Sequence, residues 1–248
     1  MNYKTKGIVL KRMNFGEADR ILTILTERFG KIKAIARGVR KGRSKLAGSL
    51  EPFMLLNLQL HEGKTFFTIT GSEIELEFSE IHTELKKTSQ AFYIAELVDK
   101  FLPEHQKSDE VSNLLVRAFE YLNDDKKSLL LRIFELKIIE ASGFHPELYE
   151  CVYCKEKLVE GNNFWDAVEG GAVCNDCQSK NHHGKNISNE LIKLFRLIEK
   201  SDFVVLERLN IDKKLELEAE DILNRYIQSV LEREVKSRGF MELVNLGS

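Results

Sequence analysis

Four cysteines carry the most specific chemical signal in this chain of 248 residues. Cys151 and Cys154 form one C-x2-C pair, Cys174 and Cys177 form a second, and 19 residues separate the two pairs. Two thiolates at this spacing can hold one ion, and two such pairs complete a tetrahedral sulfur shell for Zn²⁺. All four positions are then filled by protein ligands, so no position remains for a reactive water. The spacing predicts one structural zinc ion per chain, with a redox or iron–sulfur role as the alternative.

A run of positive charge is the second signal. Positions 28–45 contain eight Lys or Arg residues and no acidic residue, and residues 1–50 hold 13 basic against three acidic residues, a net charge of +10. The rest of the chain, with 24 basic and 36 acidic residues, carries −12. Such an asymmetry indicates a surface for a polyanion, with an ordinary solvated basic face as the alternative. The residues we expect to contact phosphates are Lys31, Lys33, Arg37, Arg40, Lys41, Arg43 and Lys45.

The backbone around these cations favours a nucleic-acid surface. On a strand, Lys31, Lys33 and Arg37 project from the face opposite Ile32 and its alternating neighbours, and the glycines of the following loop leave its cations free to adapt. Small barrels that bind single strands usually add aromatic stacking platforms. The available aromatics are also consistent with core positions: Phe15, Phe29, Phe53, Phe66 and Phe67.

The elements that must position these residues fall into two kinds. Five short segments with strand periodicity occupy 7–11, 20–26, 31–37, 54–60 and 65–70, which favours a five-stranded OB-fold barrel over an SH3-like barrel. Helical periodicity then covers about 91–102, 108–122, 127–143, 187–201 and 215–238. The fold class expected is α+β, an N-terminal barrel followed by a helical domain with an inserted four-cysteine module. The expected segments are 1–78 (barrel), 79–147 (helical, first part), 148–182 (cysteine module) and 183–248 (helical, second part).

Motifs of the common enzyme classes are missing from the sequence. Gly63-Lys64-Thr65 resembles the end of a P-loop, but the earlier glycine that a P-loop needs is replaced by Leu58. Neither H-E-x-x-H nor G-x-S-x-G occurs. A zinc-dependent nucleic-acid enzyme needs a metal site with a free coordination position, whereas four cysteine ligands would fill every position. We therefore expect a binding protein and not an enzyme, with no catalytic residue.

Composition agrees with a globular chain. The sequence is 43% hydrophobic and 31% charged, which excludes collagen-like, low-complexity and largely disordered proteins. It contains no apolar run of about 18 residues and no secretory signal pattern at its N-terminus. These features predict a cytoplasmic protein without a membrane partner.

Several separate motifs, in order along the chain, resemble the RecO family of bacterial DNA repair proteins. They are TKGIVL (5–10), GEADRILTILTERFGKIKAIARGVRKGRSKLAGSLEPF (16–53), GFHPELYECVYC (143–154), GGAVCNDC (170–177) and REVKSRGF (233–240). The resemblance implies an OB-fold, a helical domain and, since all four cysteines are kept, zinc. It also implies a recombination mediator of the RecF pathway at the bacterial nucleoid, which binds single- and double-stranded DNA and anneals complementary strands. With RecR and often RecF, such a protein helps RecA load onto DNA covered by single-strand-binding protein.

The resemblance further implies that the helical domain receives the acidic, hydrophobic C-terminal tail of single-strand-binding protein. A groove with Arg117 or Arg132 beside Phe119 or Phe134 is our hypothesis for that tail. An RNA-binding factor of translation or transcription, also built from an OB-fold and a zinc ribbon, remains the alternative function.

Overall fold

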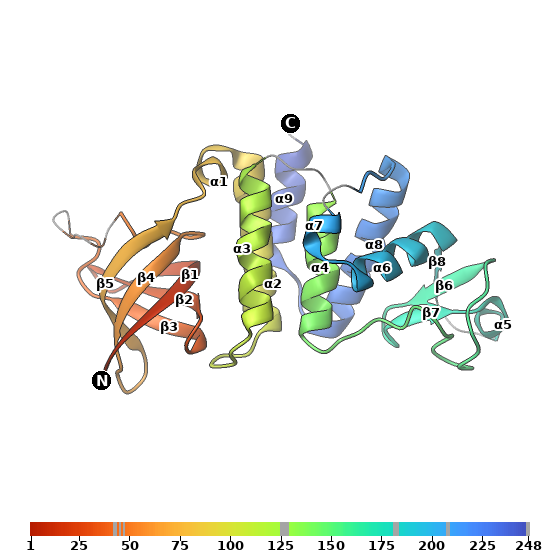
Figure 1. The fold of residues 1–248 in the computed structure, drawn as a ribbon, viewed down its shortest axis with the longest axis horizontal. Helices are drawn as coiled ribbons and strands as arrows, with labels where there is room; N and C mark the ends of the chain where they lie inside the picture. The colour runs from red at the N-terminus through yellow and green to blue at the C-terminus, as the bar shows by residue number, and fades with distance from the viewer. Residues whose placement is uncertain are drawn as a thin grey trace. The chain divides into compact units, whose positions relative to one another are not determined.

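The computed structural model describes residues 1–41, 44, 46, 48–124, 129–180, 184–206 and 209–246. The chain divides into two compact units, Met1–Asp125 with Lys236–Ser248, and Lys126–Val235. The C-terminal segment thus returns to the first unit, a grouping that differs from the four consecutive segments expected from the sequence. Figure 1 follows the order of the elements along the chain.

The first unit begins with a closed barrel in the order β1-β2-β3-β5-β4. β1 is long enough to pair with β4 through its first half and with β2 through its second, and a parallel contact between β3 and β5 closes the barrel. This is the topology of an OB-fold, so the predicted fold class is confirmed. The strands are β1 (Asn2–Phe15), β2 (Asp19–Thr26), β3 (Gly30–Ala36), β4 (Leu55–His61) and β5 (Phe67–Leu76).

Alternation along the strands fills the barrel. Ile32, Ala34 and Ala36 on β3 are fully buried in the barrel core, together with Leu56 and Leu58 on β4, as their period of two predicts. A bulge between Val9 and Lys11 shifts the register of β1. β1 runs on to Phe15, beyond the predicted end at residue 11.

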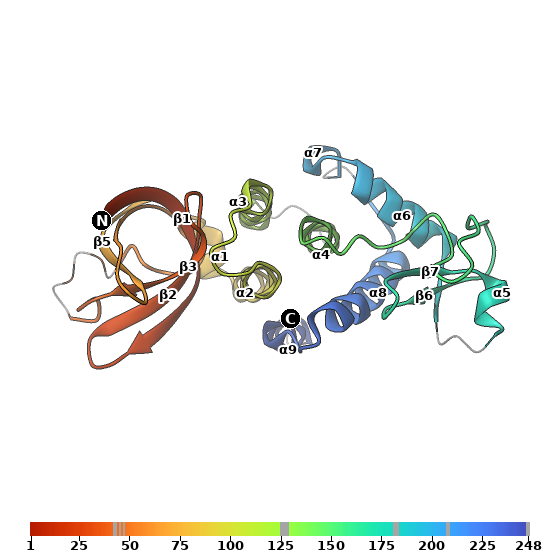
Figure 2. The same ribbon diagram turned by 90° about the horizontal axis from the view of Figure 1, so that it is seen from below.

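Helices complete the first unit. They are α1 (Ser79–Thr83), α2 (Leu85–Phe101), α3 (Asp109–Asn123) and α9 (Lys236–Leu246). α3 begins as predicted, because Ser108 accepts a hydrogen bond from the Val111 backbone N–H at 3.1 Å. α2 packs against β1, α3 and α9, and Figure 2 looks nearly along α2 and α3, which lie side by side.

The second unit joins helices to a small sheet. Its helices are α4 (Leu130–Ala141), α5 (Asn175–Gln178), α6 (Asn189–Lys200), α7 (Phe203–Leu206) and α8 (Lys213–Leu231). Its strands, β6 (Asn163–Asp166), β7 (Gly171–Val173) and β8 (Lys185–Ile187), form a sheet in the order β7-β6-β8 that the sequence analysis did not predict.

The predicted helix over 215–238 is wrong at its C-terminal end. α8 ends at Leu231 because Glu232 takes a left-handed conformation (φ 49°). α9 then starts at Lys236, where Glu96 of α2 accepts hydrogen bonds from the backbone N–H groups of Lys236 (3.1 Å) and Ser237 (2.7 Å). A carboxylate from a distant helix therefore caps α9 and separates it from α8.

Candidate functional site

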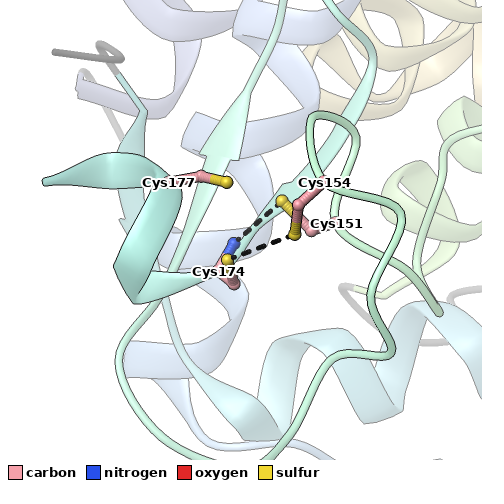
Figure 3. Close-up of side chains that lie close together, drawn as sticks. All are labelled: Cys151, Cys154, Cys174 and Cys177. Atoms are coloured by element: carbon pink, nitrogen blue, oxygen red, sulfur yellow. Dashed lines mark hydrogen bonds between the residues drawn. The ribbon is translucent and has the colours of Figure 1, made fainter. Parts of the chain in front are cut away.

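The four cysteines converge in the second unit, as Figure 3 shows. Their four sulfur atoms all lie within 4.8 Å of one another. Two sulfurs held about 2.3 Å from one ion at a tetrahedral angle are about 3.8 Å apart. Cys154 Sγ and Cys174 Sγ are separated by 3.8 Å. The predicted ligand set is therefore brought together at a spacing that fits a metal ion.

Local backbone structure sets this geometry. Cys151 and Cys154 flank a tight turn, in which the Lys155 N–H donates to the Cys151 carbonyl (2.9 Å) with Lys155 at φ 62°. Cys174 is the N-cap of α5 and Cys177 lies within that helix. A hydrogen bond from the Val152 N–H to the Ala172 carbonyl (3.0 Å) ties the first turn to β7, the strand that leads into Cys174.

Gly171 of β7 lies against the turn that holds the first cysteine pair. A Cβ atom at this position would lie 2.6 Å from Val152 Cγ1 and 2.7 Å from the Glu147 carbonyl oxygen. Only glycine permits this approach of β7 to the first turn.

The thiols differ in their affinity for protons. Burial opposes the charged form of Cys151, but backbone N–H groups, including that of Cys174 at 3.4 Å, outweigh it and lower the pKa of Cys151 to about 6. Burial and the neighbouring thiols raise the pKa of Cys177 to about 12. Cys151 thus ionises more readily than Cys177, whose thiolate a nearby cation would stabilise.

Aromatic packing supports the module on its helical side. Trp165 on β6 is buried and makes edge-to-face contacts with Phe195 of α6 and Tyr226 of α8. Tyr153, between the first two cysteines, donates a hydrogen bond to Asp166 at 2.7 Å, which raises the pKa of Tyr153 to about 12. The contacts of Trp165 attach the cysteine module to α6 and α8, and the Tyr153 hydrogen bond joins the first cysteine turn to β6.

Some of the residues predicted to form a basic surface are exposed and one of them, Lys31, is buried. Arg37, Arg40 and Lys41 are exposed after β3, and in the part of the chain that the structure describes none of the three lies in an ion pair. The Arg40 guanidinium donates to the Gly16 carbonyl (3.2 Å), which holds this loop beside the turn between β1 and β2. Arg43 and Lys45 lie outside the described residues.

Lys31 is buried, so our expectation that it is exposed is wrong. It points away from the barrel core, as the alternation predicts, but its side chain is only 7% exposed because α2 covers it. Its Nζ donates to the carbonyl oxygen of Asp99 and, at 3.0 Å, to Asp99 Oδ1. Lys33 is exposed and forms an ion pair with Glu104 at 2.5 Å.

Three of the four residues expected to line a groove for a partner tail are buried. Phe119 and Phe134 are fully buried, and Phe119 packs on Phe53 and Phe78. Arg132 is also buried, with Glu135 at 3.1 Å. This site prediction is therefore wrong, because only Arg117 of the four residues is exposed.

One exposed cation, Lys11, is absent from the set of residues predicted to contact phosphates. Lys11 is exposed on the extension of β1, and its pairing with Thr23, which in turn pairs with Lys33, places it on the same outer face as Lys33. After the bulge, every second residue lies on this face, namely Lys11, Met13 and Phe15. This strand periodicity is the signal that could have predicted that β1 extends to Phe15.

The fold and the site together define a class, that of small OB-fold proteins with a helical part and a four-cysteine metal module. Two family models match the chain, "Recombination protein O N terminal" over residues 1–78 and "Recombination protein O C terminal" over residues 82–239. The chain therefore belongs to the RecO family.

Curated relatives agree over nearly the full length. A DNA repair protein RecO from Dehalococcoides mccartyi is 36% identical over 95% of this chain and 93% of its own. Proteins of the same name from a Roseiflexus species (34% identical, 97% of this chain and 85% of the relative) and Caldanaerobacter subterraneus (32% identical, 96% of each) are also similar. No helix among the described residues combines the length and the apolar character needed to cross a membrane.

Proposed function

We propose that the protein is a DNA repair and recombination mediator that binds single- and double-stranded DNA and anneals complementary strands. The observation that carries this proposal is the set of exposed cations Lys11, Arg37, Arg40 and Lys41, with no acidic partner among the described residues, at one side of an OB-fold barrel. Membership of the RecO family supports DNA over RNA as the ligand.

The proposed annealing step follows from electrostatics. Two complementary strands repel each other through their phosphates, and cations that neutralise both strands lower the cost of bringing them together. Base pairing then supplies the sequence specificity and the free energy, so neither a catalytic residue nor ATP hydrolysis is required. Each phosphate contact with a single strand contributes about −0.7 to the slope of log K against log salt. Four contacts predict a slope of roughly −3.

The test is annealing of two complementary oligonucleotides coated with single-strand-binding protein, without ATP, at several salt concentrations. We expect the wild type to accelerate annealing in a salt-sensitive way. The triple variant Arg37→Glu, Arg40→Glu and Lys41→Glu should remain folded but lose the acceleration.

A matched control reverses three exposed lysines elsewhere, Lys86, Lys157 and Lys214, to glutamate. The control changes the net charge equally and should anneal like the wild type. Equal loss in both variants would show that net charge alone is responsible, and tighter binding to structured RNA than to single-stranded DNA would favour the RNA-binding alternative.

We also infer that the four cysteines hold zinc, one ion per chain. Four thiolates in a compact tetrahedral arrangement fit Zn²⁺ and leave no open coordination position, which suits a structural role. Elemental analysis of the purified protein should find one zinc per chain. A visible charge-transfer absorption with iron in its place would contradict this assignment.

The proposed partners follow from the same role. RecR, the tail of single-strand-binding protein and, less directly, RecF and RecA would bring the protein to gapped DNA at the nucleoid, in the bacterial cytoplasm. Since Phe119, Arg132 and Phe134 are buried, we no longer assign the tail to them. A pull-down that does not change when the tail is deleted would count against this partner.

A further inference from the structure

An apolar strip lies on the outside of the barrel. Met13 of β1 pairs with Ile21 of β2, and Ile21 pairs with Ile35 of β3, so the three side chains form one row across the strands. They face outward, because the neighbouring residue Leu22 points into the barrel core. Phe15, two residues beyond Met13, stands on the same face. We call the row of three and Phe15 the open barrel face.

The exposure of these side chains requires an explanation. Met13 is 54% exposed and Phe15 49% exposed, and Ile21 and Ile35 are partly exposed. Outward positions on an antiparallel barrel are usually polar where water covers them. Four apolar side chains in adjacent outward positions therefore mark a contact surface.

A helix covers another part of the same outer face of the barrel. Two rows further along the strands, the outward side chains are Ile8, Leu25 and Lys31, and all three are buried. α2 packs on β1 there, and Lys31 bonds to Asp99 of that helix. No described residue covers the open barrel face as α2 covers that row, so this face is available to a ligand.

Positive charge on both sides selects the kind of ligand. Lys11 lies in the row between the open barrel face and α2, beside Lys33, whose charge is paired with Glu104. Arg37, Arg40 and Lys41 follow the end of β3 on the other side. An apolar strip with cations on both sides, unpaired among the described residues, complements a polyanion that carries flat apolar groups. A single strand of nucleic acid has this character, since its bases are not hidden in base pairs.

The spacing also favours unpaired bases. Met13 and Phe15 are two residues apart on one face of β1, and side chains at this spacing on a strand are generally separated by about 6.8 Å. This is about twice the 3.4 Å spacing of stacked nucleotides in a duplex strand. Consecutive bases resting on Met13 and Phe15 would therefore be unstacked from each other, which a single strand permits and a duplex does not.

We propose that the open barrel face is a stacking platform for unpaired nucleobases, with Phe15 and Met13 each receiving one base. The proposal rests on the DNA-binding function and adds the part of the ligand that the face recognises. Of the aromatic residues considered from the sequence, Phe53 is buried, and Phe29 and Phe67 pack against the barrel core. Phe15 is the aromatic side chain of this group that the structure leaves half exposed.

The first measurement uses the variant Phe15→Trp. The chain has a single tryptophan, Trp165, which is 2% exposed in the other unit, so a tryptophan at position 15 reports on its own surroundings. We expect oligothymidine to quench the new fluorescence, whereas an abasic oligonucleotide of the same length and charge should bind without quenching it.

The second measurement is affinity. Stacking of one base on an aromatic side chain is worth about 1–3 kcal/mol, and 1.4 kcal/mol is tenfold. Phe15→Ala should therefore weaken oligothymidine binding about tenfold and leave both the salt slope and the affinity for the abasic oligonucleotide unchanged. Met13→Ala should act in the same direction. Phe240→Ala, which removes a phenylalanine that is 40% exposed on α9, should change neither affinity.

The outcomes separate this proposal from the general function. If the wild type binds no single-stranded DNA, the proposed function itself fails. If the wild type binds with the expected salt slope, but Phe15→Trp is not quenched and Phe15→Ala binds normally, only the stacking platform is refuted. Loss of a protein partner in Phe15→Ala with normal DNA affinity would likewise refute it, because the face would then be a protein interface.

Discussion

Replacing Lys31 by methionine tests whether this buried lysine holds α2 on the barrel and takes no part in DNA binding. The ammonium group of Lys31 makes two hydrogen bonds to Asp99, and its side chain is 7% exposed. Methionine keeps most of the aliphatic stem and removes the charge and both bonds. A hydrogen bond involving a charged group contributes about 1.5–3 kcal/mol. Asp99 is 31% exposed and regains water in the variant, so we expect a net loss of about 2 kcal/mol.

The matched control is Lys33→Met on the same strand and face. Lys33 and Glu104 are 46% and 45% exposed, and an exposed ion pair contributes about 0–1 kcal/mol. Denaturant unfolding of both variants should show the larger loss for Lys31→Met, with a fall in melting temperature of roughly 4–8 °C. DNA affinity below the melting transition should stay at the wild-type value.

Two results would refute the reasoning about Lys31. Equal stabilities of the two variants would mean that the contact with Asp99 does not hold α2 on the barrel. A loss of DNA affinity in Lys31→Met as large as that in Arg37→Met would mean that Lys31 reaches the ligand.

Further predictions concern the metal, one glycine and one carboxylate. A thiol-competing chelator should destabilise the second unit while the barrel still binds DNA, measured by circular dichroism and fluorescence anisotropy. Gly30→Ala should cost more than about 2 kcal/mol, because Gly30 has φ 64° and a Cβ would overlap the Gln106 backbone; Gly48→Ala, with open space around it, is the control for denaturant unfolding. Burial opposes the charge on Glu96, but hydrogen bonds from Ser237 and Lys236 lower its pKa below 4.5. The ionised form therefore stabilises the fold above that pH and loses this effect as pH falls, so the stability difference between wild type and Glu96→Gln should shrink from pH 7 towards pH 3; a constant difference would contradict the capping role.

Local patterns made most of the barrel and the ligand set of the metal module predictable. Alternation identified Ile32, Ala34 and Ala36 as core because a strand places every second side chain on the same face. The two C-x2-C pairs predicted a common site because each pair fits one tight turn, and the four sulfurs do lie together. The small sheet β6–β8 escaped prediction, since strands of three or four residues carry too little periodicity.

Contacts between distant segments explain the wrong predictions. Phe119 and Arg132 have residue types that suit a binding groove, but the packing of the helices buries both. The helical pattern over 215–238 continues past Leu231, yet Glu96, more than 130 residues earlier, caps a new helix at Lys236. Neither contact leaves a trace in the local sequence.

By itself the sequence determined the barrel, the four metal ligands, the concentration of positive charge near the N-terminus and the family, since each depends on residue types at short spacing or on motifs in order. The tertiary structure alone decided which outward positions of the barrel stay open. Alternation separates inside from outside, but it cannot tell whether a helix later in the chain covers the outside. α2 covers Lys31 and leaves Phe15 exposed, and that difference defines the face that we expect DNA to occupy.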